Sequence, residues 1–487
     1  MNIPLLYRTI RYLRPTQVFY QVKNRLIKPS YVAIEAPNVD VSNGLKTASI
    51  ARYTTWDGAQ FTFLNLKHEF SGWNFTDNGM LWAYNQNYFD WINQEGFSKE
   101  DGCRWIDRFI EDIPSNKIGL DPYPIALRSI NWVKFFCRFP DAATKTRLDS
   151  FYSQLKLLEK KFEYHLLGNH VLEDAYSLFI GAAFFGDKLL LNKAERLLMN
   201  QLKEQILPDG AHYEQSPMYH CILLDRLLDC INIRETKALV GYAQKMLGHL
   251  ESIIWADGTI PVLNDSANGI APTPKQIFDY AKLIGLKWKK ILMNECGYRK
   301  MLSGSMEAIV DVGNITATYQ PGHTHADTFN YELHIDGKPF VVDTGISTYN
   351  KTERRQLERS TIAHNCVSPD CKNSSEVWGG FRVGKRCHVV ITEDTGNVIL
   401  VSHDGFGKEC HRKFNIRDDS FSVEDWFDDE AVSYLHLAEG ADEKRVKVEG
   451  ALSVETKPWK YSTEYNRFIE GKVIEIRFKG HCRYSIQ

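Results

Sequence analysis

The 487-residue chain is long enough for two or three domains, at about 100 to 200 residues per domain. Hydrophobic residues make up 43% of it and charged residues 25%, which excludes a chain that is mainly disordered. The formal net charge of −2 gives no global electrostatic reason to bind nucleic acid, so we expect no such partner. No run of about 18 apolar residues occurs, and we therefore expect no transmembrane segment. The ten cysteines are scattered without a C-x-x-C pair, which is typical of reduced thiols.

Residues 1–40 are predicted to form an N-terminal amphipathic helical segment, because apolar and basic residues alternate through MNIPLLYRTIRYLRPTQVFYQVKNRLIKP. This stretch lacks the apolar core and the small-residue cleavage site of a signal peptide. We therefore expect a cytoplasmic location, with a periplasmic or membrane-associated location as the alternatives. The helix could lie on a membrane surface, but packing on its own domain is favoured.

Residues 41–298 are predicted to be helical, because apolar residues recur at helical spacing in segment after segment. Two helix starts carry clear signals: Asn169 precedes an apolar run, and Ser216 is followed by Pro217 at the first helical position. Short polar links between the segments indicate antiparallel helix pairs. The predicted helices span residues 79–94, 122–139, 143–166, 170–186, 188–206, 216–232, 235–255 and 273–286.

Residues 299–487 are predicted to form an antiparallel β-sandwich, because the hydrophobic period changes to two near residue 300. Residues 329–335 alternate between apolar and polar side chains and end at Asp336-Gly337, which predicts a hairpin. Further strands are predicted at residues 389–392, 398–401, 421–426, 446–448 and 473–478. Helices followed by strands indicate an α+β multidomain chain and not a doubly wound sheet.

The topology of the helical half predicts a shared rim. If successive helices alternate in direction, those that start near Pro122, Asn169 and Ser216 run the same way. Helix N-termini present unpaired N–H groups and a partial positive charge, which favours an anionic ligand. The rim would collect Tyr123, Gly168-Asn169-His170, the loop at residues 209–214, Tyr219 and His220. A groove for an acidic polymer would fit there.

Each of these residues also has a purely structural explanation. Asn169 is well placed to be a helix N-cap. Tyr219 and His220 could be half-buried aromatic side chains that only pack, and Arg128 could bridge neighbouring helices. None of these residues is decisive alone.

The strand half contains a candidate metal site. The H-x-H pair at residues 323–325, followed by Asp343 and His364, supplies the nitrogen and carboxylate ligands that Zn²⁺ prefers. Hydrogen-bonded loop histidines are the alternative. With a two-residue turn, Asp343 pairs with Asn330, so the chain must bend within residues 326–328 for the ligands to converge.

Three motifs occur in a characteristic order: Gly168-Asn169-His170, SPMYH at residues 216–220, and GHTHAD at residues 322–327 with Asp343 and His364 following. Together they resemble the heparinase II/III family of polysaccharide lyases over about residues 100 to 390. The resemblance implies an incomplete (α/α) toroid at residues 41–298, followed by the β-sandwich at residues 299–487, with the substrate held between them. It also implies a carbon–oxygen lyase that cleaves a uronate-containing acidic polysaccharide by β-elimination.

The resemblance also implies roles for single residues. Asn169, with His170, would neutralise the uronate carboxylate, while Tyr219 and His323 would act as acid and base. A structural Zn²⁺ would be held by His325, Asp343 and His364, and no organic cofactor is expected. Substrate contacts are expected from Arg128, His220, Glu214 and Tyr349.

These residue types suit β-elimination, because a carboxylate stabilises a neighbouring carbanion poorly until its charge is offset. Tyrosine ionises near pH 10 and histidine near 6.5, so either could move a proton, and the sequence leaves open which one is the base. A zinc-dependent glycan hydrolase and a non-catalytic glycan-binding protein of the same fold are the alternatives. The oligomeric state is also left open.

Overall fold

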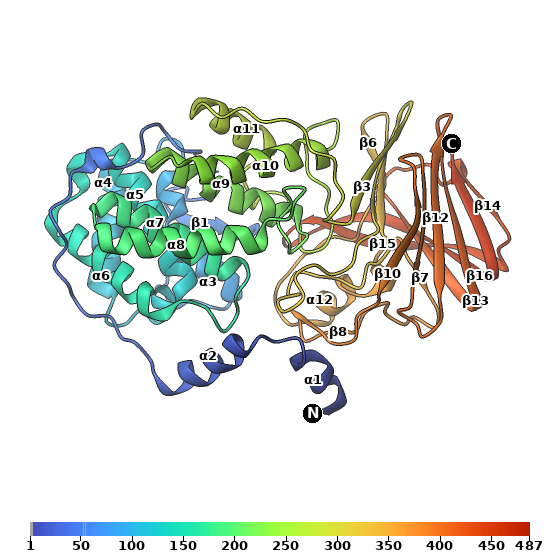
Figure 1. Cartoon of the computed structure of the whole chain (residues 1–487), viewed down its shortest axis with the longest axis horizontal. Helices are drawn as coiled ribbons and strands as arrows, with labels where there is room; N and C mark the ends of the chain where they lie inside the picture. Colours follow the sequence, from blue (N-terminus) through green and yellow to red (C-terminus); the bar gives the residue numbers. More distant parts are fainter. Residues whose placement is uncertain (1–2, 52, 54) are drawn as a thin grey trace.

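The computed structural model describes residues 3–51, 53 and 55–487. Helices occupy one end of the molecule and strands the other, while α1 (Ile3–Ile10) and α2 (Pro15–Leu26) lie along one edge (Figure 1). The change from helix to strand falls between α11 (Pro274–Leu283) and β3 (Tyr298–Ser303), where the hydrophobic period of the sequence changes. No helix in the described part of the chain is both long and apolar enough to span a membrane.

The helical half is an incomplete (α/α) toroid, and all eight predicted helices are present. α7 packs against α5 on one side and α9 on the other. One further helix, α4, was missed because Gly102 lowers its intrinsic propensity; this glycine lies where a Cβ would collide with the Phe135 ring. The helices besides α1, α2 and α11 are α3 (Met80–Tyr88), α4 (Lys99–Asp112), α5 (Pro122–Arg138), α6 (Lys145–Lys161), α7 (Asn169–Phe185), α8 (Lys188–Gln205), α9 (Pro217–Ile233), α10 (Lys237–Ile253) and the short α12 (Glu353–Glu358).

Most of the strand half is one antiparallel sheet that curls over a shared apolar core and so forms the predicted sandwich; residues 377–378 and 382–383 form a separate two-stranded sheet. In the described residues twelve strands are connected, in the order β10-β11-β12-β13-β6-β5-β4-β3, with β7 on β13 and with β14 and β15 on β16. The two longest strands, β13 (Ser420–Leu437) and β16 (Arg467–Ile486), pair with each other, and their register shifts between Phe427 and Glu430. The remaining strands are β1 (Gln60–Phe63), β2 (Leu66–Glu69), β4 (Met306–Asp311), β5 (Tyr331–Ile335), β6 (Lys338–Val341), β7 (Val367–Ser368), β8 (Val377–Trp378), β9 (Arg382–Val383), β10 (Val389–Asp394), β11 (Val398–His403), β12 (Cys410–Arg417), β14 (Val446–Glu449) and β15 (Ser453–Glu464).

The predicted Asp-Gly hairpin joins β5 and β6. Asp336 and Gly337 both have positive φ, 52° and 71°, as this tight turn requires. The predicted bend before β5 is also present, since the backbone N–H of Asn330 donates to the carbonyl of Asp327 at 2.8 Å. This bend returns the chain toward the helical half.

Buried hydrogen bonds hold the two halves together. Asp209, in the loop before α9, accepts from the backbone N–H groups of Asn294 at 3.0 Å and Cys296 at 2.9 Å. Glu332 on β5 accepts from the backbone N–H of Val262 at 3.1 Å. Because the two carboxylates are buried, breaking these hydrogen bonds costs more free energy than breaking the same hydrogen bonds in water. A site between the halves is therefore held in a defined geometry.

Candidate active site

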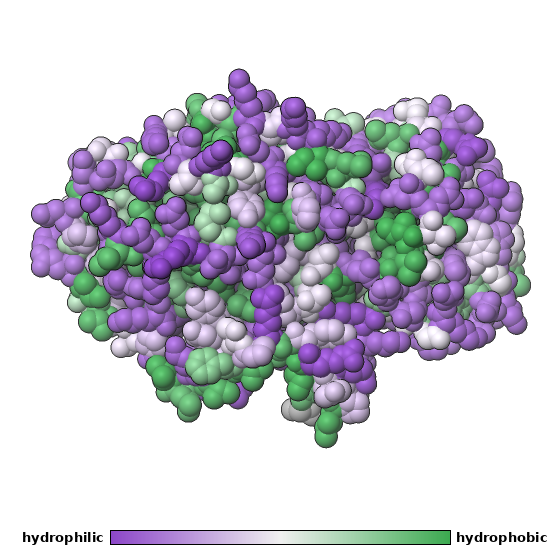
Figure 2. All heavy atoms as spheres, viewed as in Figure 1, coloured by the Kyte–Doolittle hydropathy of each residue, from purple (hydrophilic) through white to green (hydrophobic). Residues whose placement is uncertain are grey.

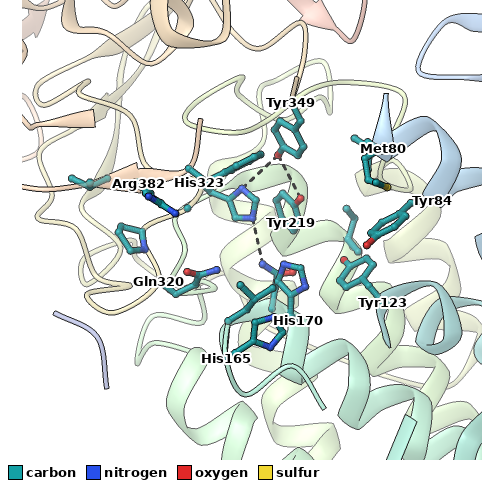
Figure 3. Close-up of a pocket in the computed structure, with 18 of the residues that line it drawn as sticks. Met80, Tyr84, Tyr123, His165, His170, Tyr219, Gln320, His323, Tyr349 and Arg382 are labelled. Atoms are coloured by element: carbon teal, nitrogen blue, oxygen red, sulfur yellow. Dashed lines mark hydrogen bonds between the residues drawn. The ribbon is translucent and has the colours of Figure 1, made fainter. Parts of the chain in front are cut away.

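A cavity of about 680 Å³ lies between the two halves. The first turns of α5, α7 and α9 contribute Tyr123, Asn169 and Tyr219 to its wall, which confirms that these helix starts share one rim. The strand half contributes His323 and Tyr349 (Figure 3). Side chains of α1 and α2, and of the link between them, close another part of the wall: Leu6, Leu13, Gln17 and Gln21.

Asn169 is held in place by Glu214. Its backbone N–H donates to Glu214 Oε1 and its Nδ2 donates to Glu214 Oε2, both at 2.8 Å. The N-cap of α7 is Gly168, with φ of 62°, and Asn169 is the first helical residue, so Asn169 does not act as the cap. The second hydrogen on Nδ2 points toward His323 Nε2 at 3.3 Å. This amide is therefore oriented toward the centre of the site.

Tyr219 and His323 meet across the cavity from opposite halves of the chain. Their ring centroids lie 4.0 Å apart with an interplanar angle of 31°. Ser216 caps α9 by accepting from the backbone N–H of Tyr219, which fixes the first helical turn. The hydroxyl of Tyr349 lies 3.4 Å from the Tyr219 hydroxyl and 3.5 Å from His323 Nδ1 (Figure 3).

Asp265 orients His323, and the sequence analysis missed it. Its carboxylate lies 2.9 Å from His323 Nδ1 and receives both terminal nitrogens of Arg355, at 2.6 and 2.7 Å. Although burial opposes ionisation, Arg355 and the two neighbouring histidines hold the pKa of Asp265 well below its usual range. An ionised carboxylate only accepts hydrogen bonds, so Nδ1 of His323 carries the proton and Nε2 presents its lone pair to the cavity.

The two tyrosines at the site are held neutral. Burial raises the pKa of Tyr219 far above its ordinary value. The hydrogen bond with Tyr349 lowers this pKa, while the Asp265 and Glu214 carboxylates raise it further. Burial likewise raises the pKa of Tyr349. A neutral phenol is a hydrogen-bond and proton donor, so the site pairs one donor, Tyr219, with one acceptor, His323 Nε2.

His170 lies on the cavity wall beside Tyr123, with ring centroids 4.9 Å apart. Its Nδ1 lies 2.9 Å from Glu163 Oε2. Burial lowers the pKa of His170, but the Glu163 carboxylate outweighs burial and raises it above the ordinary value. The raised pKa favours the charged form of His170, on the wall that also holds Asn169.

Three predicted substrate contacts are wrong, because the structure gives these residues other partners. The Arg128 guanidinium is enclosed between Asn87 O, Gly119 O and Gln154 Oε1 at 2.7 to 2.9 Å. His220 is buried. Its Nε2 forms a hydrogen bond with the Met246 carbonyl, and its Nδ1 accepts one from the His212 backbone N–H. Glu214 is buried under Asn169 and orients it, so neither oxygen faces the cavity. Of the predicted contact residues, Tyr349 does line the cavity.

Replacing Arg128 with Ala tests this placement. The change leaves three buried acceptors without a donor, at about 1 to 3 kcal/mol each, so we expect the free energy of unfolding to fall by about 3 kcal/mol or more. Urea unfolding measures the loss, with Arg196→Ala as the control because Arg196 is exposed and does not line the cavity. The activity per folded molecule of Arg128→Ala should stay at the wild-type level. A raised KM with unchanged stability would contradict the structural assignment.

The predicted zinc ligands come together beneath the site. His325 Nε2 lies 2.8 Å from Asp265, and His364 Nδ1 lies 2.7 Å from Asp343, so the other nitrogen of each ring carries the lone pair. Those two nitrogens, and Asp327 Oδ2, are buried without a hydrogen-bond partner among the residues that the structure describes. Metal-bound histidines commonly donate their second nitrogen to a carboxylate in this way. These are donor types that Zn²⁺ takes, with Asp327 as a carboxylate that the sequence analysis did not consider, although their ligand atoms do not all lie within 4.8 Å of one another.

A second group of ligand-type side chains lies elsewhere. Within the described ranges, the ligand atoms of Asp209, His249 and Cys296 lie within 4.8 Å of one another. The Asp209 carboxylate already binds two backbone N–H groups there. This group joins the end of the helical half to the start of the strand half, and it does not line the cavity.

Comparisons with known proteins agree with this architecture. Residues 125–283 match the family description "Heparinase II/III N-terminus", and residues 286–481 match "Heparinase II/III-like, C-terminal". The chain is 27% identical over 263 residues to a heparin-sulfate lyase of Pedobacter heparinus, covering 46% of this chain and 39% of that protein. It is 21% identical over 336 residues to a heparin-sulfate lyase of Bacteroides stercoris, covering 60% and 50%. These alignments span half or less of the length of the relatives.

The fold is shared along the whole chain with a solved structure. The crystal structure of heparinase III superposes with a TM-score of 0.64 at 15% identity, covering 99% of this chain and 93% of that one. Both family descriptions, in the expected order, account for most of the sequence from residue 125 onward. The chain therefore belongs to the heparinase II/III family.

Proposed function

We propose that this protein is a polysaccharide lyase that cleaves a uronate-containing acidic glycan by β-elimination. The observation that carries the proposal is the meeting of Tyr219 and His323, whose rings lie 4.0 Å apart on the wall of the cavity between the two halves. The Asn169 amide lies beside them, 3.3 Å from His323 Nε2. Proton acceptor, proton donor and carboxylate-binding amide are thus in one place, which is what β-elimination needs.

The lone pair on His323 Nε2 is the base in this proposal. It takes the proton from the ring carbon that bears the uronate carboxylate, because Asp265 fixes the proton on Nδ1 and stabilises the imidazolium that forms. Tyr219 is a poor base here, because burial raises its pKa. The proposal therefore takes His323 as the base, out of the two candidates that the sequence left open.

Tyr219 is the acid that completes the reaction. As the carbanion electrons form the new carbon–carbon double bond, the bond to the glycosidic oxygen breaks, and the Tyr219 hydroxyl protonates that oxygen. The products are a shortened chain and an unsaturated uronate end. Loss of a proton from His323 and gain of one by Tyr219 then restore the resting site, so no water is added to the glycan.

Asn169 holds the substrate carboxylate in this proposal. One Nδ2 hydrogen stays on Glu214 at 2.8 Å, while the second reaches His323 only at 3.3 Å and can turn to an incoming carboxylate. His170, whose pKa is raised by Glu163, adds charge compensation on the same wall. Offsetting the carboxylate charge makes the enolate-like intermediate accessible.

The rest of the cavity wall favours sugar rings over dense sulfate. Tyr84, Tyr88, Tyr123, Phe381 and Tyr465 give it aromatic faces on which sugar rings can stack. Three arginines of this wall are already engaged within the protein: Arg226 pairs with Asp225 at 2.7 Å, Arg382 stacks on the Trp378 ring and Arg386 stacks on the Tyr12 ring. We therefore propose a sparsely sulfated or unsulfated uronate glycan as the substrate.

A bound Zn²⁺ would have a structural role in this account. His325 and His364, with a carboxylate from Asp327 or Asp343, would hold it, and its charge would stiffen the root of the hairpin that carries His323. His325 also contacts Asp265 and so links this group to the base.

Chelation separates this role from a catalytic one. We expect purified protein to carry about one zinc per chain, and removal by a strong chelator to lower the melting temperature of the protein. Activity per folded molecule should fall by a smaller factor, and added zinc should restore stability. Complete loss of activity with unchanged melting temperature would favour the zinc-dependent hydrolase instead.

The test of the proposed function is a panel of uronate polymers, from unsulfated to heavily sulfated, followed by absorbance of the unsaturated product in the near ultraviolet. A lyase produces this absorbance on at least one polymer of low sulfation. Tight binding of a polymer without any change in its chain length would support the non-catalytic alternative.

A further inference from the structure

The outer face of α1 and α2 is not explained by the site. None of the residues of α1 is buried, and α2 buries only Gln17. The inner faces are anchored by polar contacts: Arg8 pairs with Glu376 of the strand half, and Gln17 donates to the Leu166 carbonyl of the helical half. The two helices are thus fixed to both halves, while their outer faces are left uncovered by the residues that the structure describes.

These outer faces form an apolar stripe. On α1, Ile3 and Tyr7 are four residues apart, and on α2, Phe19, Val22 and Leu26 are spaced by three and four residues. Nine of the twenty exposed large hydrophobic side chains in the described chain fall within residues 3–32, so they are concentrated there. Their exposed fractions reach 73% for Ile3 and 79% for Leu26. Figure 2 shows apolar atoms gathered over these helices at the lower edge of the molecule.

The same segment is strongly basic. Residues 1–34 contain six Lys and Arg and no Asp or Glu, so the remaining chain has 53 basic and 61 acidic residues. Arg11, Arg25 and Lys28 form no ion pair with a carboxylate of the described residues. A segment of net charge +6 thus sits on a body of net charge −8. Arg8 and Arg14 pair with Glu376 and Glu204, so contacts with the rest of the protein account for only part of this positive charge.

We propose that the outer face of α1 and α2 docks on an anionic lipid bilayer. An apolar stripe flanked by Lys and Arg is the pattern of a helix that lies in the membrane interface, where the stripe enters the acyl boundary and the cations meet lipid phosphates. Helices of 8 and 12 residues are too short to span a bilayer. A second copy of this face is a poorer occupant, because two faces of like charge would repel each other.

Docking would place the cavity next to the membrane. The inner faces of the same two helices, through Leu6 and Gln21, form part of the cavity wall. The glycan-cleaving site would then work on chains held near a lipid surface. The docking itself does not depend on the proposed lyase activity.

Vesicle co-sedimentation of the full chain tests the proposal. We expect binding to phosphatidylcholine vesicles that contain phosphatidylglycerol, weaker binding at high salt, and little binding to phosphatidylcholine alone. The double variant Arg25→Gln/Lys28→Gln should bind about 25-fold more weakly, at about fivefold per basic residue. The double variant Phe19→Glu/Val22→Glu should lose binding. None of these four side chains lines the cavity.

Two control variants match these changes elsewhere on the surface. Leu292→Glu alters an isolated side chain that is 86% exposed, and Lys188→Gln/Lys203→Gln removes two exposed charges from α8. Both should bind vesicles like the wild type. Absence of binding to phosphatidylglycerol vesicles, equal binding to both vesicle types, or unchanged binding of Phe19→Glu/Val22→Glu would overturn the proposal. A dimer that dissociates in Phe19→Glu/Val22→Glu, without vesicle binding, would assign the face to a second copy.

Discussion

Replacing Tyr219 with Phe is expected to lower kcat by about 100- to 10,000-fold, the usual contribution of a positioned general acid. The variant keeps the ring that packs on His323 and loses only the hydroxyl that protonates the leaving oxygen. The fold should be unchanged, because the hydroxyl makes one long contact, at 3.4 Å to Tyr349. Initial rates from product absorbance, together with a melting curve, measure both effects.

Tyr349→Phe is the matched control for this change. Its hydroxyl lies in the same cavity but only at 3.4 and 3.5 Å from Tyr219 and His323. We expect a much smaller loss of kcat than for Tyr219→Phe. Equal losses in the two variants, or a normal rate in Tyr219→Phe, would remove Tyr219 from the role of acid.

Replacing Asp265 with Asn is expected to lower both stability and activity. Arg355 would be left buried without its carboxylate, which costs about 3 to 5 kcal/mol of unfolding free energy. His323 would lose the acceptor that fixes its tautomer, and kcat should fall by a factor on the order of 1,000 to 10,000. Urea unfolding and initial rates measure the two losses separately.

The double variant Asp265→Asn/Arg355→Met separates the two effects. It removes the uncompensated charge, so stability should recover in part, because replacing a buried ion pair with an apolar group is often close to neutral. Activity should stay low, because the orienting carboxylate is still absent. Recovery of kcat in the double variant would show that Asp265 acts on stability alone.

Local signals in the sequence were enough to predict most elements. The helix that begins at Pro217 carries its N-cap Ser216 and its proline at the first position, and the structure has both. The Asp336-Gly337 turn was predicted because few residues other than Gly and Asp tolerate its positive φ. Such features depend on neighbours along the chain, so one sequence suffices to find them.

Elements that depend on tertiary contacts were missed. The hairpin of β1 and β2 was not predicted, since its Leu66–Glu69 strand is short and three of its four residues are polar. The N-terminal segment was favoured to pack on its own domain, and it instead bridges both halves, with Gln17 between the Leu166 and Tyr319 carbonyls. Periodicity reports that a face is apolar, but it does not report what covers that face.

The residues of the candidate site show the same difference between local signals, which were predicted, and tertiary contacts, which were missed. Asn169 and Tyr219 were singled out because they sit at helix starts and His323 because it lies in a dense motif, and their roles were predicted from the family resemblance of these motifs. Asp265 lies in an ordinary loop, after Asn264 with φ of 53°, and only its contacts with His323 and Arg355 identify it. Arg128 was predicted to contact substrate because the sequence does not show that three acceptors from distant segments enclose its guanidinium.

The most direct test of the lyase chemistry is the mass of the products formed from a cleaved uronate glycan in water enriched in heavy oxygen. Elimination through His323 and Tyr219 adds no water, so the two products together should have the mass of the starting chain, and neither should contain solvent oxygen. Products that are heavier by one water molecule and carry the heavy oxygen would show hydrolysis and contradict the proposed function.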